Sequence, residues 1–285
     1  LKMYVVGLSN DNVNEYNLST AWDVSTASYL QNFSIAAQET LPIGVFFKPD
    51  GLKMYIIGLS GDDVNEYNLS TAWDVSTASY LQNFSVRGQE SNPSGVFFKP
   101  DGLKMYIIGS AGDTVDEYNL STAWDVSTAS FSQNFSIAGQ ETNPMGVFFK
   151  PDGLKMYVTG TAGDDVNEYN LSTAWDVSTA SYLQNFSIAQ KENIPRSVFF
   201  KPDGLKMYFV GDSSDTVFQY DLSTAWDIST ASYSTPTTEY FSVKVQETNP
   251  TGLFFKPDGL KMYVTGYTRD DVNEYNLSTA WDIST

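Results

Sequence analysis

The side chains of this sequence that could do chemistry are mostly carboxylates. The 285 residues include 34 Asp and Glu against 16 Lys and Arg, with no His and no Cys. The usual proton shuttle at neutral pH is therefore missing, as are a thiolate nucleophile, a disulfide framework and a cysteine zinc site. What remains for a functional site is a set of acidic loops, a few scattered cations and six tryptophans.

Acidic residues gather in six related loops. Asp62 and Asp63 form a pair in one of them, and such pairs recur at 164–165 and 270–271. Several carboxylates together with backbone carbonyls suit Ca²⁺, although none of these loops has the spacing of an EF-hand. Asp and Asn are also ordinary turn residues, so the calcium hypothesis stands beside a purely structural one, and we expect no other cofactor. The binding candidates that we take from these loops are Asp63, Asp113, Asp165, Asp215 and Asp271.

Paired carboxylates could also serve acid–base catalysis, provided that two different environments separate the acid from the base. Each acidic residue here recurs in other copies of a repeat with its surroundings nearly intact. A catalytic centre normally breaks such symmetry, so the sequence predicts no catalytic residues and no enzyme. A metal-dependent hydrolase or lactonase with carboxylates around a central channel remains a third alternative.

The elements that position these residues come from one repeated unit. Leu-Lys-Met-Tyr begins at residues 1, 52, 103, 154, 205 and 260, and an Ala-Trp-Asp follows each copy. We therefore expect a single domain over residues 1–285. Within the third unit, four strands are expected at 95–99, 103–109, 115–120 and 130–137, and they are called here the first to the fourth strand of the repeat. Four short antiparallel strands in about 50 residues predict an all-β propeller blade.

The phase of the repeat predicts incomplete ends. The chain opens in a second strand and stops shortly after a third strand. We therefore expect six blades with incomplete terminal blades, as in a fragment of a longer protein. Unpaired sheet edges attract other strands, so self-association through these terminal blades is also expected.

The sequence motifs of the repeated unit resemble those of known propeller repeats. Pro-Asp-Gly-x-Lys-x-Tyr followed by Val-x-x-Tyr-x-Leu resembles the repeats of YVTN-type and NHL-type propellers. The longer motif, Phe-Phe-Lys-Pro-Asp-Gly with Leu-Ser-Thr-Ala-Trp-Asp, is similar to repeat arrays in proteins of marine phages and bacteria. The resemblance covers the whole chain and implies the propeller architecture, but it implies no catalytic residues.

The repeats differ from one another mainly in two loops, which antiparallel order places at the same end of every blade. One joins the second and third strands (the second–third loop), and the other joins the fourth strand to the next first strand (the fourth–first loop). Cations outside the constant motifs fall only there, in an acidic setting that we expect to form one face. Further binding candidates from these loops are Arg87, Lys191, Arg196, Arg269 and Tyr267.

The fifth unit departs most from the others. It carries Phe209, Asp212, Phe218, Gln219 and Asp221 at altered positions and an insertion around 234–240. Either this unit carries a specific site or it is an older, more diverged copy, and both interpretations stay open.

The six tryptophans could stack on sugars or fill the space between blades. They are Trp22, Trp73, Trp124, Trp175, Trp226 and Trp281. A net charge of −18 argues against a nucleic-acid partner, and no apolar run approaches the roughly 18 residues of a membrane span. The sequence thus predicts a non-enzymatic interaction and display module of an extracellular or virion protein, which binds an unidentified protein or glycan. A glycan-binding propeller is the alternative.

Overall fold

The computed structural model describes residues 1–7, 10–233, 239–268 and 271–285. The chain divides into two compact units, Leu1–Ala138 and Gly139–Thr285, and each contains three antiparallel sheets. The prediction of a single domain stays a prediction.

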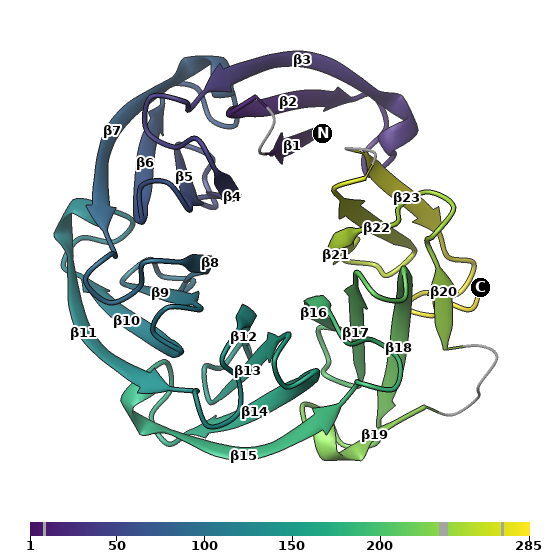
Figure 1. Cartoon of the computed structure of the whole chain (residues 1–285). Coiled ribbons are helices and arrows are strands. Elements are labelled where there is room, and N and C mark those ends of the chain that lie inside the picture. The colour runs from purple at the N-terminus through teal and green to yellow at the C-terminus, as the bar shows by residue number, and fades with distance from the viewer. Residues whose placement is uncertain (8–9, 234–238, 269–270) are drawn as a thin grey trace. The chain divides into compact units, whose positions relative to one another are not determined.

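The first unit contains sheets 1 to 3, with their strands in chain order across each sheet (Figure 1). They are β1 (Lys2–Val6), β2 (Asn12–Leu18) and β3 (Ala27–Ser34); β4 (Pro42–Phe47), β5 (Lys53–Gly58), β6 (Asp63–Leu69) and β7 (Ala78–Ser85); and β8 (Pro93–Phe98), β9 (Lys104–Gly109), β10 (Thr114–Leu120) and β11 (Ala129–Ser136).

The second unit contains sheets 4 to 6. They are β12 (Pro144–Phe149), β13 (Lys155–Gly160), β14 (Asp165–Leu171) and β15 (Ala180–Ser187); β16 (Pro195–Phe200), β17 (Lys206–Gly211), β18 (Thr216–Leu222), β19 (Ala231–Ser232) and β20 (Tyr240–Ser242); and β21 (Pro250–Phe255), β22 (Lys261–Gly266) and β23 (Val272–Asn276).

The fold is therefore the predicted all-β, six-bladed propeller with four-stranded antiparallel blades. Sheet 1 has no first strand and sheet 6 has no fourth strand among the described residues, as the phase of the repeat predicted. The fourth strand of sheet 5 differs from the expectation, because it consists of two short segments, β19 and β20, that both pair with β18. The insertion of the fifth unit lies between these two segments, and most of it is outside the described residues.

The turn between the first and second strands explains the constant Pro-Asp-Gly. Asp101 accepts a hydrogen bond from the backbone N–H of Leu103 at 3.0 Å, and Gly102 has a left-handed φ of 74°. A side chain at Gly102 would lie 2.3 Å from the Trp124 indole nitrogen. Glycine is thus required both for the backbone conformation and for the close approach of the indole.

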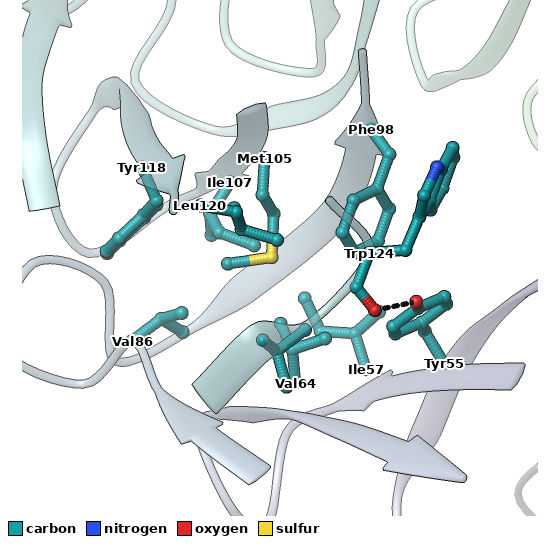
Figure 2. Close-up of a cluster of buried hydrophobic side chains, with 11 residues drawn as sticks. Tyr55, Ile57, Val64, Val86, Phe98, Met105, Ile107, Tyr118, Leu120 and Trp124 are labelled. Carbon is teal, nitrogen blue, oxygen red and sulfur yellow. Dashed lines mark hydrogen bonds between the residues drawn. The ribbon is translucent and has the colours of Figure 1, made fainter. Parts of the chain in front are cut away.

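Within each unit, neighbouring sheets pack through apolar side chains from every strand position. Figure 2 shows one such cluster, in which Tyr55 and Ile57 of sheet 2 meet Phe98 and Met105 of sheet 3. The Tyr55 hydroxyl donates to the main-chain oxygen of Trp124 at 2.7 Å, so the polar end of this buried ring is satisfied.

A buried carboxylate in the third strand joins adjacent sheets. Glu66 accepts hydrogen bonds from Lys53, from Gln82 at 2.9 Å, and from the backbone N–H of Val126 in the next sheet at 2.8 Å. Glu15 and Glu168 make the same link to the backbone N–H groups of Val75 and Ile228, so these glutamates are structural.

Candidate active site

One ion pair in the second unit breaks the symmetry of the repeat. Arg196 is the second residue of β16, and Asp212 directly follows β17. The strand register pairs Pro195 with Gly211, which brings these two side chains to the same end of sheet 5. Arg196 Nε and Nη2 donate to one oxygen of Asp212, Oδ2, at 2.8 and 2.6 Å.

Neighbouring sheets of the same unit complete the cluster. Met145 of β12 places its sulfur 3.5 Å from Arg196 Nη1. Asn249, just before β21, donates its side-chain amide to Asp212 Oδ1 at 2.6 Å and to Oδ2 at 3.0 Å in the orientation that satisfies its surroundings. The cluster therefore joins residues from sheets 4, 5 and 6.

No other repeat has this pair. The position of Arg196 is uncharged elsewhere, and so is the position of Asp212. The residues at the first position are Ile43, Ser94, Met145 and Thr251, and those at the second are Leu8, Leu59, Ser110, Thr161 and Tyr267. The prediction that no acidic residue breaks the symmetry of the repeats is therefore wrong at Asp212.

A second carboxylate holds the loop that carries Asp212. Glu192 accepts the backbone N–H groups of Ile194, Ser213 and Ser214 at 2.8, 3.0 and 3.1 Å. Burial alone would raise the pKa of Glu192, but these donors and the two serine hydroxyls hold it below its usual range. The loop is thus fixed before any ligand arrives.

The pair is accessible and retains free bonding capacity. The side chains of Arg196 and Asp212 are 30% and 13% exposed. A carboxylate has about four lone-pair sites, and Asp212 Oδ1 uses one of them, on Asn249. That oxygen can accept a proton from a water molecule while the guanidinium faces developing negative charge.

Two of the predicted aspartates of the second–third loops are held by hydrogen bonds within their own sheets. Asp63 and Asp165 are buried, and each accepts hydrogen bonds from two nearby asparagine amides, at 2.6 Å from Asn65 to Asp63 and at 2.5 Å from Asn167 to Asp165. Burial raises the pKa of both carboxyls.

Asp113 and Asp215 lie one position earlier in their loops, with left-handed φ angles of 51° and 52°. Their main-chain oxygens accept backbone N–H groups at 2.9 Å. Asp271 is exposed. Across residues 1–7, 10–233, 239–268 and 271–285, no three acidic side chains form a group that could hold a metal ion.

The predicted cations and Tyr267 do not meet at one place within either unit. Arg87 lies 3.5 Å from Asp62, and Lys191 lies over the ring of Tyr233 at 4.5 Å. Tyr267 is more than half exposed, and Arg269 is outside the described residues. Among these cations, as far as the described residues show, Arg196 is the one that donates two hydrogen bonds to a carboxylate.

The tryptophans mostly pack between sheets. Trp124 is 7% exposed and stacks on Phe46 of the preceding sheet, and Trp175, Trp226 and Trp281 are equally buried. Little indole surface is left there for a sugar. Trp22 and Trp73 are exposed by 40% and 37%.

Sequence reasoning had marked Arg196 and Asp212 separately, one as a binding candidate and the other as a departure of the fifth unit. It missed Met145 and Asn249, because both come from neighbouring sheets. A comparison of each position across the six units could have identified the pair, because both residues are charged only in the fifth unit.

Comparisons with solved structures place the chain among propellers. The periplasmic gluconolactonase of Pseudomonas aeruginosa is 15% identical, with a TM-score of 0.63 over 93% of this chain and 73% of that one. A protein of Bacteroides fragilis, provisionally assigned as a 6-phosphogluconolactonase, is 14% identical, with a TM-score of 0.65 over 96% and 76%. Nidogen, in its complex with laminin, is 13% identical, with a TM-score of 0.66 over 100% and 90%. At these identities the likeness shows the fold alone.

No protein-family description matches the chain, and no curated protein matches it by sequence. The solved propellers that it resembles include gluconolactonases, and this finding overturns the predicted non-enzymatic interaction and display module. Both a lactonase and nidogen share the fold, so the fold is compatible with catalytic and with binding proteins. No helix in the described part of the chain is long and apolar enough to cross a membrane.

Proposed function

We propose that this chain hydrolyses a sugar lactone at the Arg196–Asp212 pair. The observation that carries the proposal is the ion pair itself, which one repeat holds where the other repeats have uncharged residues. The gluconolactonases among the similar structures support the choice of substrate class.

The reaction needs no group beyond those in the cluster. Asp212 Oδ1 accepts a proton from water, and the resulting hydroxide attacks the lactone carbonyl. The negative charge that develops on the carbonyl oxygen is stabilised by the Arg196 guanidinium. The ring C–O bond then breaks, the ring oxygen takes the proton back, and the product is the open-chain sugar acid.

The charges favour an uncharged substrate. The ion pair is neutral as a unit, and the chain carries a net charge of −18. A phosphorylated lactone would bring a dianion close to this acidic protein. We therefore expect glucono-1,5-lactone to be a better substrate than its 6-phosphate.

The test is the rate of acid release from each lactone at constant pH, after subtraction of the rate without protein. Sheet 4 supplies matched variants, because Met145 and Thr161 occupy the two positions there. Arg196→Met and Asp212→Thr should each lower the catalysed rate about 100-fold or more with the fold retained. Arg87→Ser, which removes an exposed cation elsewhere, should leave the rate unchanged. A wild-type rate equal to the background would refute the proposal.

Two further inferences concern origin and location. We infer that the unit belongs with the YVTN-type and NHL-type repeats, on the strength of its Pro-Asp-Gly-Leu-Lys-Met-Tyr turn. We also propose that the protein works outside the cytoplasm, which the periplasmic gluconolactonase among its structural neighbours supports. Fractionation of the native cells, with detection by antibody, would test this location.

A further inference from the structure

An asparagine directly precedes the first strand in sheets 3, 4 and 6, as Asn92, Asn143 and Asn249. Its main chain is held by the residue that follows the second strand of the same sheet. The main-chain oxygen of Asn92 accepts the N–H of Ser110 at 3.2 Å, and that of Asn249 accepts the N–H of Tyr267 at 3.1 Å. These asparagines therefore start from the same backbone position.

Their side chains nevertheless have different partners. Asn92 donates its amide to the Ser110 hydroxyl of its own sheet, and sheet 4 has the same bond. In sheet 6 the place of Ser110 is taken by Tyr267, which has its hydroxyl at the far end of a ring. The Asn249 amide instead donates to Asp212 of sheet 5. The loss of a short hydroxyl side chain in sheet 6 thus leaves an amide donor for the neighbouring sheet.

Sheet 5 has the reciprocal change. Ile194 stands where sheets 3, 4 and 6 have asparagine, so this position of sheet 5 has no side-chain amide. The backbone link is retained, because the Asp212 N–H donates to the Ile194 main-chain oxygen at 3.1 Å. Sheet 5 therefore has an acceptor without its own amide donor, and sheet 6 has a donor without its own hydroxyl acceptor. The two meet across the sheets.

This bond fixes the direction of the Asp212 carboxylate. Arg196 donates from Nε and Nη2 to Oδ2, and the terminal torsion of an aspartate is broad, so a carboxylate held through one oxygen can turn. Asn249 adds a bond to Oδ1 at 2.6 Å and one to Oδ2 at 3.0 Å. We propose that Asn249 is a positioning residue, which holds Oδ1 in the orientation that receives the proton from water. This inference rests on the proposed hydrolysis.

The central variant is Asn249→Leu in the full chain, assayed by acid release from glucono-1,5-lactone. The repeat accepts leucine at this position, as Leu41 of sheet 2 shows. We expect kcat to fall about tenfold or more, and KM to change less than about twofold, because the bond acts on the base and not on the bound lactone. Asn92→Leu is the matched control. It removes the same amide from the same backbone position and should leave the rate unchanged.

A second-site variant separates positioning from a merely structural role. Ile194→Asn offers Asp212 an amide from its own sheet, in the relation that Asn92 has to Ser110. Added to Asn249→Leu, it should recover about threefold or more of the lost kcat. A rate that was lost through damage to the fold would not return in this way.

The contact also has a readout that needs no activity. Asn249→Leu and Asp212→Thr remove the two ends of one bond, so the double variant should lose less in urea midpoint than the two single losses together. Asn92→Leu and Asp212→Thr share no bond, and their losses should add.

Four results would overturn the inference. They are an unchanged rate in Asn249→Leu, equal rate losses in Asn249→Leu and Asn92→Leu, no recovery with Ile194→Asn, and additive midpoint losses for Asn249→Leu with Asp212→Thr. A wild type without lactonase activity would refute the proposed hydrolysis and with it the catalytic role of Asn249. The midpoint cycle would still decide separately whether Asn249 holds Asp212.

Discussion

Strands β1 and β9 begin with the same residues, Lys-Met-Tyr, yet they lie in different environments. Tyr106 of β9 is completely buried beneath β8, whereas Tyr4 of β1 is half-exposed. The second strand of this repeat is thus buried only when a first strand covers it. The comparison separates what the unit contributes by itself from what its neighbours add.

The largest expected effect is on stability, and it compares Gly109 at the end of β9 with Gly7, which directly follows β1. Gly109→Ala puts a methyl group 2.4 Å from the Asn92 main-chain oxygen and 2.5 Å from the Glu90 carboxyl. Because backbone must move, we expect the free energy of unfolding to fall by about 3 kcal/mol. The same change at Gly7 should cost less than about 0.5 kcal/mol. Chemical denaturation of both variants measures the difference between the two losses. Equal losses would show that the first strand beside β9, which β1 lacks among the described residues, makes no difference.

The next effect concerns the buried glutamates. Glu66→Gln keeps two acceptor bonds but leaves Lys53 without its carboxylate, and we expect a loss of about 2 kcal/mol. Sheet 5 shows a natural alternative, in which Gln219 accepts the Ile283 N–H at 3.2 Å and Lys206 pairs with Asp221 at 2.7 Å.

Adding Asn68→Asp to Glu66→Gln should therefore restore about half of the loss. Lys53 lies opposite Asn68 in the register, as Lys206 lies opposite Asp221. A double-mutant cycle by urea denaturation measures the coupling. Purely additive effects would mean that Gln219 and Asp221 of the fifth unit do not compensate for one another.

The smallest effects are two pH dependences of opposite sign. Hydrogen bonds, first from the Ser127 hydroxyl, hold the pKa of Asp125 below its usual range. Its contribution is present at neutral pH and is lost as the pH falls through that lowered pKa. Asp125→Ala should therefore cost about 1 kcal/mol at pH 7 and progressively less below about pH 4.

Asp63 should show the opposite trend, because burial raises its pKa. The folded state then holds the proton to higher pH than the unfolded state, so stability falls as the pH rises through this range. Relative to the wild type, Asp63→Asn should become more favourable between pH 3 and pH 7. Urea denaturation midpoints of Asp125→Ala and Asp63→Asn, each relative to the wild type, measure these trends from pH 3 to pH 7. Midpoint differences that change in the same direction with pH for both variants would contradict the assignment.

The fifth unit shows why a departure from the repeat is ambiguous in sequence. Phe209 and Phe218 stack at 5.0 Å in the core, and Gln219 with Asp221 preserves the link to Lys206 and sheet 6. These changes alter packing and hydrogen bonds inside the fifth sheet and toward sheet 6. Arg196 and Asp212 instead form an accessible cluster, and nothing in a linear comparison distinguishes the two groups.

The sequence by itself determined the repeat, its four strands, the Pro-Asp-Gly turn and the incomplete first and last sheets, because these depend on local conformation and on alternation within about 50 residues. Only the tertiary structure decided the rest. Which loop aspartates are buried, which tryptophan has a free face and which cation has a partner all depend on strands from neighbouring sheets. Met145 and Asn249 reach the Arg196–Asp212 pair across roughly 50 and 40 positions of chain, a proximity that packing alone creates.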